Sequence, residues 1–505
     1  MAGRVAVAHP VKPTHHRASF MARILILGAG ISGHTAARCL GRWVGKQHQV
    51  VVVSPKPTWN WVPSNIWVAV GEMAEHQVAY ELAPIYKKVN VDFRQASALS
   101  IHPEGDADHA KPFVRIEYTD PARVGEAESI EYDFLINATG PKLNFAATPG
   151  LGPETGHTVS VCTPPHALEA NRRLQAAIAA MKNGAQQTLV IGTGHGMATC
   201  QGAAFEYICN VDHVLRETGV RQQARLIWLS NEYEVGDLGI GGVLITRGGY
   251  VTSGKVFVES LMAERGIEWI TRAHVNRVEP GIIHYELLDG THHTLDFDFA
   301  MLIPAFAGVG LKAFDPSGTD ITEQLFAPNG FMKVDADYTP KAYEDWGKQD
   351  WPKTYQTPAY KNIFAIGIAF APPHLISKPM KSPNGTPINP SAARTGMPSA
   401  AIGKAVASSI RDILKGADAP THTASMAEMG AACMASTGKH VLRGSAATMT
   451  VFPVVPDYET YPRFGRDLNL TYGEVGLAGH WMKFLLHHAF IYQARLRPGW
   501  FLLPH

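Results

Sequence analysis

Cysteine is scarce in this chain. Five cysteines occur among 505 residues, and no two of them form a Cys-x-x-Cys pair. So few and so scattered cysteines exclude a disulfide scaffold, and the missing Cys-x-x-Cys spacing argues against a zinc or thioredoxin-type centre. If two of them pair, the pattern favours a catalytic pair over a structural one. The five are Cys39, Cys162, Cys200, Cys209 and Cys433.

An excess of charge of either sign is also absent. The 45 lysines and arginines nearly balance the 44 aspartates and glutamates. A balanced chain offers no surplus positive field for a polyanion, so we expect no nucleic-acid partner. Long apolar runs are missing too, because no stretch reaches the roughly 18 uncharged apolar residues of a transmembrane helix.

The 23 histidines do not form a pattern typical of a metal site. The visible clusters are adjacent pairs, and neighbours in sequence point to different faces of a helix or strand. We therefore predict no bound metal. The N-terminal residues 1–20 contain Pro10 and Pro13 and lack an apolar run long enough for a signal-peptide core, so we expect a disordered extension there.

The most informative motif follows this extension. An apolar run from Arg23 leads into Gly28-x-Gly30-x-x-Gly33 and then into an alanine-rich helical segment. A buried strand, a tight glycine turn and a helix N-terminus present N–H groups and a positive dipole end to a pyrophosphate, which predicts a dinucleotide site. The next strand ends at Ser54, where an acidic residue usually binds the ribose, and this difference weakens the case for exchangeable NAD.

A second motif of this kind begins with the strand-like run at residues 188–194. Its turn reads Gly192-x-Gly194-x-x-Met197, so the third glycine, which permits close packing of helix on strand, is missing. A helix is expected at about 199–216, followed by a strand at 225–230. Further strand-like segments, Ile267–Ile270, Ile282–Tyr285 and Met301–Pro304, are expected to continue the same sheet.

Two later segments return to the first motif. A buried strand closes on the small turn Ala138-Thr139-Gly140, and another, residues 362–366, runs into Gly367. A proline-rich stretch follows, and Thr395-Gly396 opens a helix through about Ile413 whose N-terminus could face an anionic ring edge.

This order predicts an α/β protein with two doubly wound Rossmann-like domains, the second inserted in the first. We expect a split first domain at 21–155 and 325–415, a second domain at 156–324, and a C-terminal segment at 416–505.

The C-terminal stretch from Glu474 to Pro498 has apolar residues at the spacing of an amphipathic helix. Two interpretations stay open. The helix either packs on its own domain or lies on a membrane surface, and the second is favoured by the trailing arginines together with Trp500, Phe501 and Leu502.

Several short motifs together resemble those of the sulfide:quinone oxidoreductases, a branch of the two-domain flavin disulfide reductases. The resemblance covers about residues 21–500. It also explains two departures from the wider superfamily, namely Ile368 where most relatives have an aspartate after the late glycine, and the degenerate second glycine turn. The motifs are Pro63-Ser64-Asn65-x-Trp67-Val68-Ala69-Val70-Gly71, Ala138-Thr139-Gly140-Pro141-Lys142-Leu143, Val161-Cys162-x-x-x-His166-Ala167, Gly239-x-Gly241-Gly242 and Gly367-Ile368-Ala369.

The resemblance implies FAD in the first domain and two redox-active cysteines beside it. The cysteines are Cys162 and Cys433, one from each half of the chain, while the other three are interpreted as packing residues. Many members of the family carry a further cysteine that this chain lacks between Cys39 and Cys162. The residues implied to bind the cofactor are Gly28, Gly30, Ile31, Ser32, Gly33, Ser54, Pro55, Ala138, Thr139, Gly140, Gly367, Thr395 and Gly396.

The implied reaction oxidises sulfide to polysulfide or zero-valent sulfur and passes the electrons to a membrane quinone. Phe370 and Pro372 are the candidate quinone contacts. His166 and Glu169 are candidate proton carriers, while Lys378, Lys381 and Arg394 are candidate contacts for the reduced ring. The family likeness implies a peripheral, monotopic protein on the cytoplasmic membrane, with the side of the membrane and a homo-oligomeric state left open.

Three other interpretations compete with this one. The first is a type II-like NADH:quinone oxidoreductase of the same fold with inert cysteines, against which Met197 argues. The second is the flavoprotein subunit of a cytochrome-linked sulfide dehydrogenase, which normally has an export signal and lacks a lipid-facing tail. The third is a non-enzymatic FAD-stabilised scaffold, which leaves the two cysteine motifs unexplained.

Overall fold

The computed structural model describes residues 21–391, 396–440 and 442–503. Its largest sheet has the strand order β21-β8-β1-β2-β5-β6-β7, with β20 also paired to β5. The first five of these strands run parallel, whereas β5, β6 and β7 form an antiparallel extension. The strands are β1 (Arg23–Leu27), β2 (Gln49–Ser54), β5 (Val91–His102), β6 (Phe113–Tyr118), β7 (Ala127–Glu131), β8 (Phe134–Asn137), β20 (Lys312–Ala313) and β21 (Ile363–Ala365).

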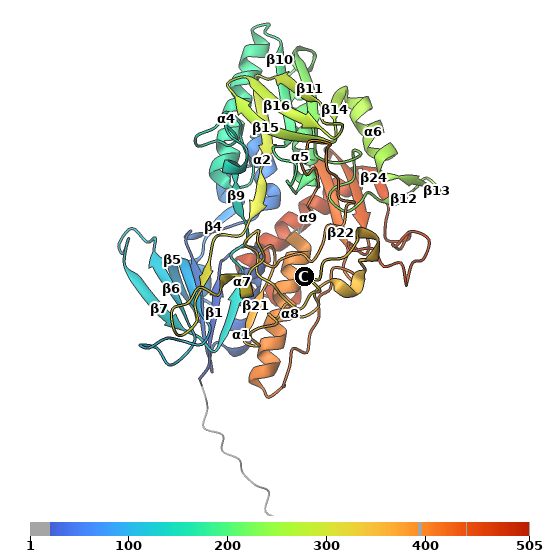
Figure 1. Ribbon diagram of the computed structural model, residues 1–505. Coiled ribbons are helices and arrows are strands. Elements are labelled where there is room, and N and C mark those ends of the chain that lie inside the picture. The colour runs from blue at the N-terminus through green and yellow to red at the C-terminus, as the bar shows by residue number, and fades with distance from the viewer. Residues whose placement is uncertain (1–20, 392–395, 441, 504–505) are drawn as a thin grey trace, which may run out of the picture.

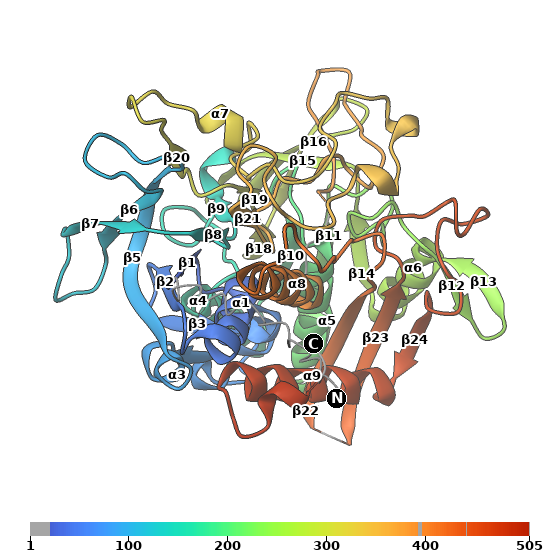
Figure 2. The same cartoon turned by 90° about the horizontal axis from the view of Figure 1, so that it is seen from below.

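Two helices pack side by side against the parallel part of this sheet, namely α1 (Ile31–Val44) and α8 (Gly396–Leu414) (Figure 2). Their backbones approach closely because Gly403 of α8 has no side chain. A Cβ atom at Gly403 would lie 2.5 Å from the carbonyl oxygen of Ser32. The late strand β21 pairs with β8 beside β1, so a segment more than 200 residues away in sequence completes the sheet that carries the first glycine turn.

A second parallel sheet has the order β14-β11-β10-β18 and lies in the upper part of Figure 1. The segment Ile282–Tyr285 does not continue it, contrary to the sequence prediction, because that strand pairs antiparallel on both sides in a separate sheet, β15-β16-β17. The elements of this region are α4 (Pro164–Lys182), β10 (Gln187–Thr193), α5 (Gln201–Glu217), β11 (Ala224–Leu229), α6 (Gly254–Arg265), β14 (Ile267–Ile270), β15 (Ala273–Glu279), β16 (Ile282–Leu287), β17 (His292–Asp296) and β18 (Phe299–Ile303).

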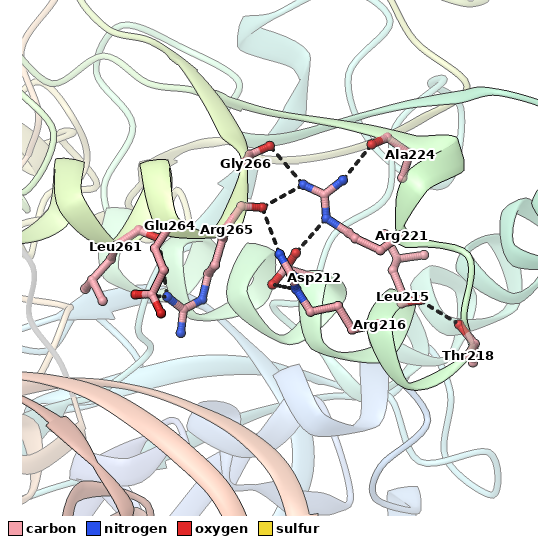
Figure 3. A network of polar contacts seen from close by, with 10 residues as sticks. All are labelled: Asp212, Leu215, Arg216, Thr218, Arg221, Ala224, Leu261, Glu264, Arg265 and Gly266. Atoms are coloured by element: carbon pink, nitrogen blue, oxygen red, sulfur yellow. Dashed lines mark hydrogen bonds and ion pairs between the residues drawn. The ribbon is translucent and has the colours of Figure 1, made fainter.

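A buried carboxylate ties the ends of two helices of this region together (Figure 3). Asp212 of α5 accepts hydrogen bonds from the guanidinium groups of Arg216, at 2.9 Å, and Arg221, at 2.7 Å. Arg221 in turn donates to the carbonyl oxygens of Arg265 and Gly266 at the end of α6. The network satisfies helix-end carbonyls that would otherwise lack partners, so it fixes α5 relative to α6.

The C-terminal part forms a three-stranded antiparallel sheet that the sequence did not predict. It consists of β22 (Ala431–His440), β23 (Arg443–Val451) and β24 (Gly473–Gly476), and it packs against α5 and against α9 (Leu477–Ala494) (Figure 2). Helix α9 matches the predicted C-terminal helix and is followed by the short turn Trp500–Leu502. Within the described residues, no helix is both long enough and apolar enough to cross a membrane.

Shorter elements connect these parts. They are β3 (Thr58–Asn60), α2 (Asn65–Ala69), β4 (Ala79–Glu81), α3 (Ala83–Lys87), β9 (Lys142–Asn144), β12 (Leu244–Arg247), β13 (Tyr250–Ser253), β19 (Ala305–Ala307) and α7 (Thr322–Leu325). The fold class is the predicted one, with Rossmann-like parallel sheets and a C-terminal helix. The domain boundaries at residues 155, 324 and 415 stay a prediction.

Candidate functional site

The first glycine turn is built so tightly that only glycine fits at two of its three positions. A Cβ at Gly28, whose φ is +98°, would lie 2.2 Å from the carbonyl oxygen of Ala138. A Cβ at Gly33 would lie 2.1 Å from the carbonyl oxygen of Gly28. At Gly30, by contrast, no heavy atom lies within 4 Å of the Cβ position. The turn is therefore closed where it packs and open at the position where a pyrophosphate approaches the backbone.

Two helix N-termini meet beside this opening. Neither α1 nor α8 has an acidic residue in its first turn, and Gly30 provides no side-chain cap for α1. A Cβ at Gly396, the first residue of α8, would lie 3.4 Å from the side chains of both Ile31 and Trp61. The positive ends of two helix dipoles thus face the same region, which favours an anionic ligand. Thr395 and Arg394, predicted to border this point, lie outside the described residues.

The remaining predicted cofactor residues surround the same turn. Gly367, with φ +64°, packs on α1 so closely that a Cβ would lie 2.3 Å from the Ser32 hydroxyl oxygen. Gly140, with φ +69°, has open space at its Cβ position, and Thr139 donates from its hydroxyl to Asn137 at 2.8 Å. Ser54 is buried at the end of β2, and its hydroxyl donates to the carbonyl oxygen of Lys56. Pro55 follows it and is exposed.

These observations fit a bound dinucleotide. Packing requires glycine at Gly28 and Gly33, whereas the space at Gly30, where the ligand would lie, is open. Uncapped N–H groups face that space. Ser54 keeps an acceptor oxygen for a ribose hydroxyl in place of a carboxylate. The chain therefore has the chemistry to hold FAD in this turn.

The second glycine turn has a different environment, because its N–H groups are already used. The backbone N–H of Gly196 donates to Nδ1 of His274 at 3.0 Å, and that of Met197 donates to Nδ1 of His195 at 3.0 Å. The pKa of His195 is lowered to about 4, first by burial and then by the neighbouring His274, so its ring is neutral at physiological pH and can accept this bond.

The proline-rich segment covers the rest of this turn. The N–H of Asn389 donates to the Gly196 carbonyl at 2.7 Å, and the N–H of Ser391 donates to the Ala198 carbonyl at 3.1 Å. A Cβ at Gly196 would lie 2.3 Å from the carbonyl oxygen of Pro387. Residues 387–391 therefore pack on the backbone where a second pyrophosphate would approach, which the sequence indicated only through the missing glycine at Met197.

Cys162 lies two residues before the first turn of α4 and is half-buried. Its N–H donates to the Ser160 hydroxyl at 3.2 Å, while the Thr163 hydroxyl caps α4 by accepting from the N–H of His166. Burial raises the pKa of the Cys162 thiol, whereas a hydrogen bond from Ser160 lowers it. The thiol is therefore protonated at rest near neutral pH, at a helix end that favours its thiolate.

Cys433 lies on β22, opposite Met449 of β23, and its thiol faces α5. The thiol donates to the carbonyl oxygen of Gly202 at an Sγ to oxygen distance of 3.9 Å. Burial, together with the nearby Glu206 carboxylate, raises the pKa of Cys433 to about 12. Cys162 and Cys433 are both free thiols, so no S–S bond joins them and their pairing stays a prediction.

A short helix connects the two cysteine segments, and the sequence analysis missed it. Within α2, the Asn65 amide donates to the carbonyl of Val161, next to Cys162, at 3.2 Å. The indole N–H of Trp67 donates to the carbonyl of Ser436, three residues after Cys433, at 3.3 Å. One turn of helix thus holds both segments. Its sequence signal was hidden by the preceding aromatic and proline residues.

The structure corrects the role expected of Glu169. Glu169 accepts hydrogen bonds from Arg172 and Arg173 on the surface of α4, and the bond from Arg172 is the main cause that lowers its pKa to about 2. A carboxylate that stays ionised cannot carry a proton near neutral pH. Lys378 pairs with Glu344 on the surface, and its contact with the reduced ring stays a prediction.

His166, the other predicted proton carrier, contacts Glu154 at 2.7 Å, and Lys381 is exposed. Phe370 is fully buried, and its ring lies edge-to-face with that of Tyr355, with 5.1 Å between the two ring centres. This packing favours a core role. Pro372 is half-buried, and the quinone contacts stay a prediction. Cys200, interpreted as a packing residue within a helix, instead precedes α5 in a left-handed conformation at φ +66°.

The first part of the chain matches a known protein family. Residues 22–225 match the family model described as pyridine nucleotide-disulphide oxidoreductase. Among curated proteins, the chain is similar to the sulfide-quinone reductase of Aquifex aeolicus (strain VF5). The two are 28% identical over 439 residues, which cover 86% of this chain and 85% of that relative.

Comparison with solved structures shows the same similarity. The crystal structure of the sulfide:quinone oxidoreductase from Aquifex aeolicus superposes with a TM-score of 0.71 at 26% identity, covering 94% of this chain and 92% of that one. NDH2 from Plasmodium falciparum in complex with NADH superposes with a TM-score of 0.60 at 12% identity, covering 94% and 96%. The likeness at 12% identity is one of fold alone.

Proposed function

Because this chain is an FAD-dependent oxidoreductase related to the sulfide-quinone reductases, we propose that it oxidises sulfide at Cys162 and Cys433 and delivers the electrons to a membrane quinone. The observation that carries the proposal is the pair of hydrogen bonds from α2, since Asn65 binds the Cys162 segment and Trp67 binds the Cys433 strand. A single rigid turn that holds two distant cysteine segments is what a two-thiol reaction requires.

The chemistry starts from a bridge between the two cysteines, direct or extended by further sulfur. Hydrosulfide attacks one sulfur of a direct bridge, forming a new S–S bond as the old one breaks, so that one cysteine becomes a persulfide and the other a thiolate. Cys162, at the N-terminus of α4, is stabilised as a thiolate by the helix dipole. FAD, when bound, supplies the two-electron acceptor and the route to quinone.

Anaerobic mixing with sulfide tests this function directly. The holoenzyme in its oxidised state should lose the flavin absorption at about 450 nm within seconds, because sulfide supplies two electrons for each flavin. Adding a soluble quinone such as decylubiquinone should restore the band. A flavin band that stays unchanged at millimolar sulfide would contradict the proposal.

NADH should not replace sulfide as the electron donor. The Gly196 and Met197 N–H groups bind His274 and His195, and residues 387–391 pack on the turn, so a second pyrophosphate lacks donors and space. We expect the rate of flavin reduction by about 1 mM NADH to be at least about 1,000-fold below that by sulfide, a loss of roughly 4 kcal/mol in transition-state stabilisation. Stopped-flow absorbance measures both rates. Fast bleaching by NADH would favour the NADH:quinone oxidoreductase interpretation.

Helix α9 supports the membrane part of the proposal, because three polar side chains lie on its buried face while large apolar side chains are exposed on its outer face. Its buried face carries His480, Lys483 and His487, which contact Ser436, Glu206 and Ser64 respectively. Its outer face exposes apolar side chains, with exposed fractions of 47% for Trp481, 41% for Met482, 70% for Leu485 and, just beyond the helix, 77% for Leu502. A monotopic protein presents such a face to lipid.

Replacing two of these leucines should weaken membrane binding. We expect the Leu485→Glu/Leu502→Glu double variant to bind phosphatidylcholine/phosphatidylglycerol vesicles at least about 100-fold more weakly, because burying one leucine contributes about 1.5–3 kcal/mol. Vesicle sedimentation measures the change. Val124→Glu is the matched control, since Val124 is 69% exposed on the β6–β7 hairpin, away from α9 in both views (Figures 1 and 2). Unchanged binding of the double variant would contradict the role of α9.

A further inference from the structure

A buried ion pair joins the C-terminal helix α9 to α5. The Lys483 ammonium lies 2.9 Å from Oε2 of Glu206, and the exposed fractions of the two side chains are 11% and 6%. The ammonium also lies 5.9 Å from the centre of the Trp67 ring in α2. A buried ion pair contributes little net stability, because removing both charges from water costs about as much as their attraction returns. The presence of this buried pair therefore needs an explanation other than the stability of the fold.

The pair lies beside Cys433. The Cys433 thiol contacts the carbonyl oxygen of Gly202, and Glu206 is the residue one helical turn further along the same face of α5. The next turn of α5 carries Asn210, whose amide donates to the Ser436 carbonyl on the Cys433 strand at 2.8 Å. Gly202, Glu206 and Asn210 thus form the face of α5 on which β22 packs. The carboxylate oxygen Oε1 of Glu206 is buried without a hydrogen-bond partner among the described residues.

The charged and titratable groups that face Cys433 come from three directions. Helix α5 contributes Glu206 and Cys209, the segment after β11 contributes Glu232, and α9 contributes Lys483 together with His480, which contacts Ser436. Strand β23 places the uncharged Met449 opposite the cysteine. Lys483 is the one fixed positive charge in this group. Charges in a setting that excludes water act strongly on a neighbouring thiol.

We propose that Glu206 and Lys483 are positioning residues that control the ionisation of Cys433, with the ammonium stabilising the thiolate and the carboxylate opposing it. When Glu206 accepts the proton of Cys433, directly or through one water, an S–H bond breaks, an O–H bond forms and no electrons move. Lys483 then changes its ion-pair partner from the Glu206 carboxylate to the Cys433 thiolate. The Cys433 thiolate thereby gains a counter-ion as it forms, and the total charge of the three groups stays constant.

The structure supports both halves of this exchange. Burial raises the pKa of Glu206, and Lys483 opposes that rise, so the carboxylate is a stronger base than a surface glutamate. The pKa of Cys433 is raised to about 12, mainly by burial and then by Glu206, while Lys483 acts to lower it. The catalytic meaning of the exchange rests on the proposed function, but the ionisation of the thiol can be measured without sulfide.

The experiment measures the rate at which iodoacetamide alkylates Cys433 in the reduced holoenzyme between pH 6 and pH 10, quantified by peptide mass spectrometry. Only the thiolate reacts, so the pH profile reports its ionisation. Glu206→Gln should raise the rate at pH 8 at least about threefold, and Lys483→Met should lower it by a similar factor, since half a pKa unit changes the thiolate fraction about threefold. The double variant, which removes both charges, should return to within about twofold of the wild-type rate.

Cys162 provides an internal reference in the same digest, and its alkylation rate should stay constant in all variants. Glu206→Asp and Lys483→Arg keep the charges and should keep the wild-type profile, which separates charge from packing if Lys483→Met folds poorly. Single variants that shift the rate in the same direction, or leave it unchanged, would overturn the proposal. A positive result together with a flavin that sulfide cannot reduce would retain the charge control and refute the proposed function instead.

Discussion

Replacing Cys433 or Cys162 by serine lowers the rate of sulfide-dependent flavin reduction by at least about 1,000-fold, because each removes one of the two sulfur atoms between which the bridge forms. Serine cannot form that bridge. Neither side chain forms part of the first glycine turn, so FAD should remain bound with a normal spectrum in the oxidised state. Stopped-flow absorbance under anaerobic conditions gives the rate, and the ratio of flavin to protein absorbance gives the occupancy.

Two of the other cysteines provide matched controls. Cys209 lies on α5 close to Cys433 and is 3% exposed, and Cys39 lies on α1 and is 2% exposed. Burial raises the pKa of both thiols, so they are inert as nucleophiles. Cys209→Ala and Cys39→Ala should keep the rate within about threefold of wild type. If Cys162→Ser or Cys433→Ser kept it as well, the two-thiol reaction would be wrong, because sulfide would then reduce the flavin without that cysteine.

Local patterns were sufficient to predict the first glycine turn and its strands. The apolar runs of β1 and β2 and the spacing of Gly28, Gly30 and Gly33 are set by packing within about 30 residues, which a single sequence displays. Strand β22 could not be predicted in this way. Its sequence, AACMASTGKH, has few residues that favour strands, and its pairing with β23 and packing on α5 determine its conformation.

Contacts between distant segments account for the other features that the sequence did not predict. The closed second turn depends on residues 387–391 reaching Gly196, and the ion pair beside Cys433 joins residues separated by 277 positions. No periodicity encodes such pairings, because they follow from the packing of whole elements. The predicted C-terminal helix shows the same limit, since its pattern gave the helix but could not tell that the polar face containing Lys483 points inward.

Replacing Gly28 should lower the stability of the protein, whereas replacing Gly30 should weaken the binding of FAD. Gly28→Ala puts a methyl group 2.2 Å from the Ala138 carbonyl at a φ of +98°, so the protein without cofactor should lose several kcal/mol of unfolding free energy. Gly30 has an extended backbone, at φ −69° and ψ −168°, and open space around its Cβ position. Gly30→Val should therefore leave the free energy of unfolding of the cofactor-free protein within about 1 kcal/mol of wild type.

Cofactor binding should differ sharply between Gly30→Val and wild type. The two methyl groups of the introduced valine occupy the space through which the pyrophosphate reaches the N–H groups of α1. We therefore expect the Kd for FAD to rise at least about 100-fold, or roughly 2.7 kcal/mol. Titration of the cofactor-free protein with FAD, followed by quenching of flavin fluorescence, measures this Kd, and urea unfolding of the same sample measures stability. A folded Gly30→Val protein that bound FAD normally would place the cofactor elsewhere. Tight binding lost together with stability would instead assign Gly30 to packing, as for Gly28.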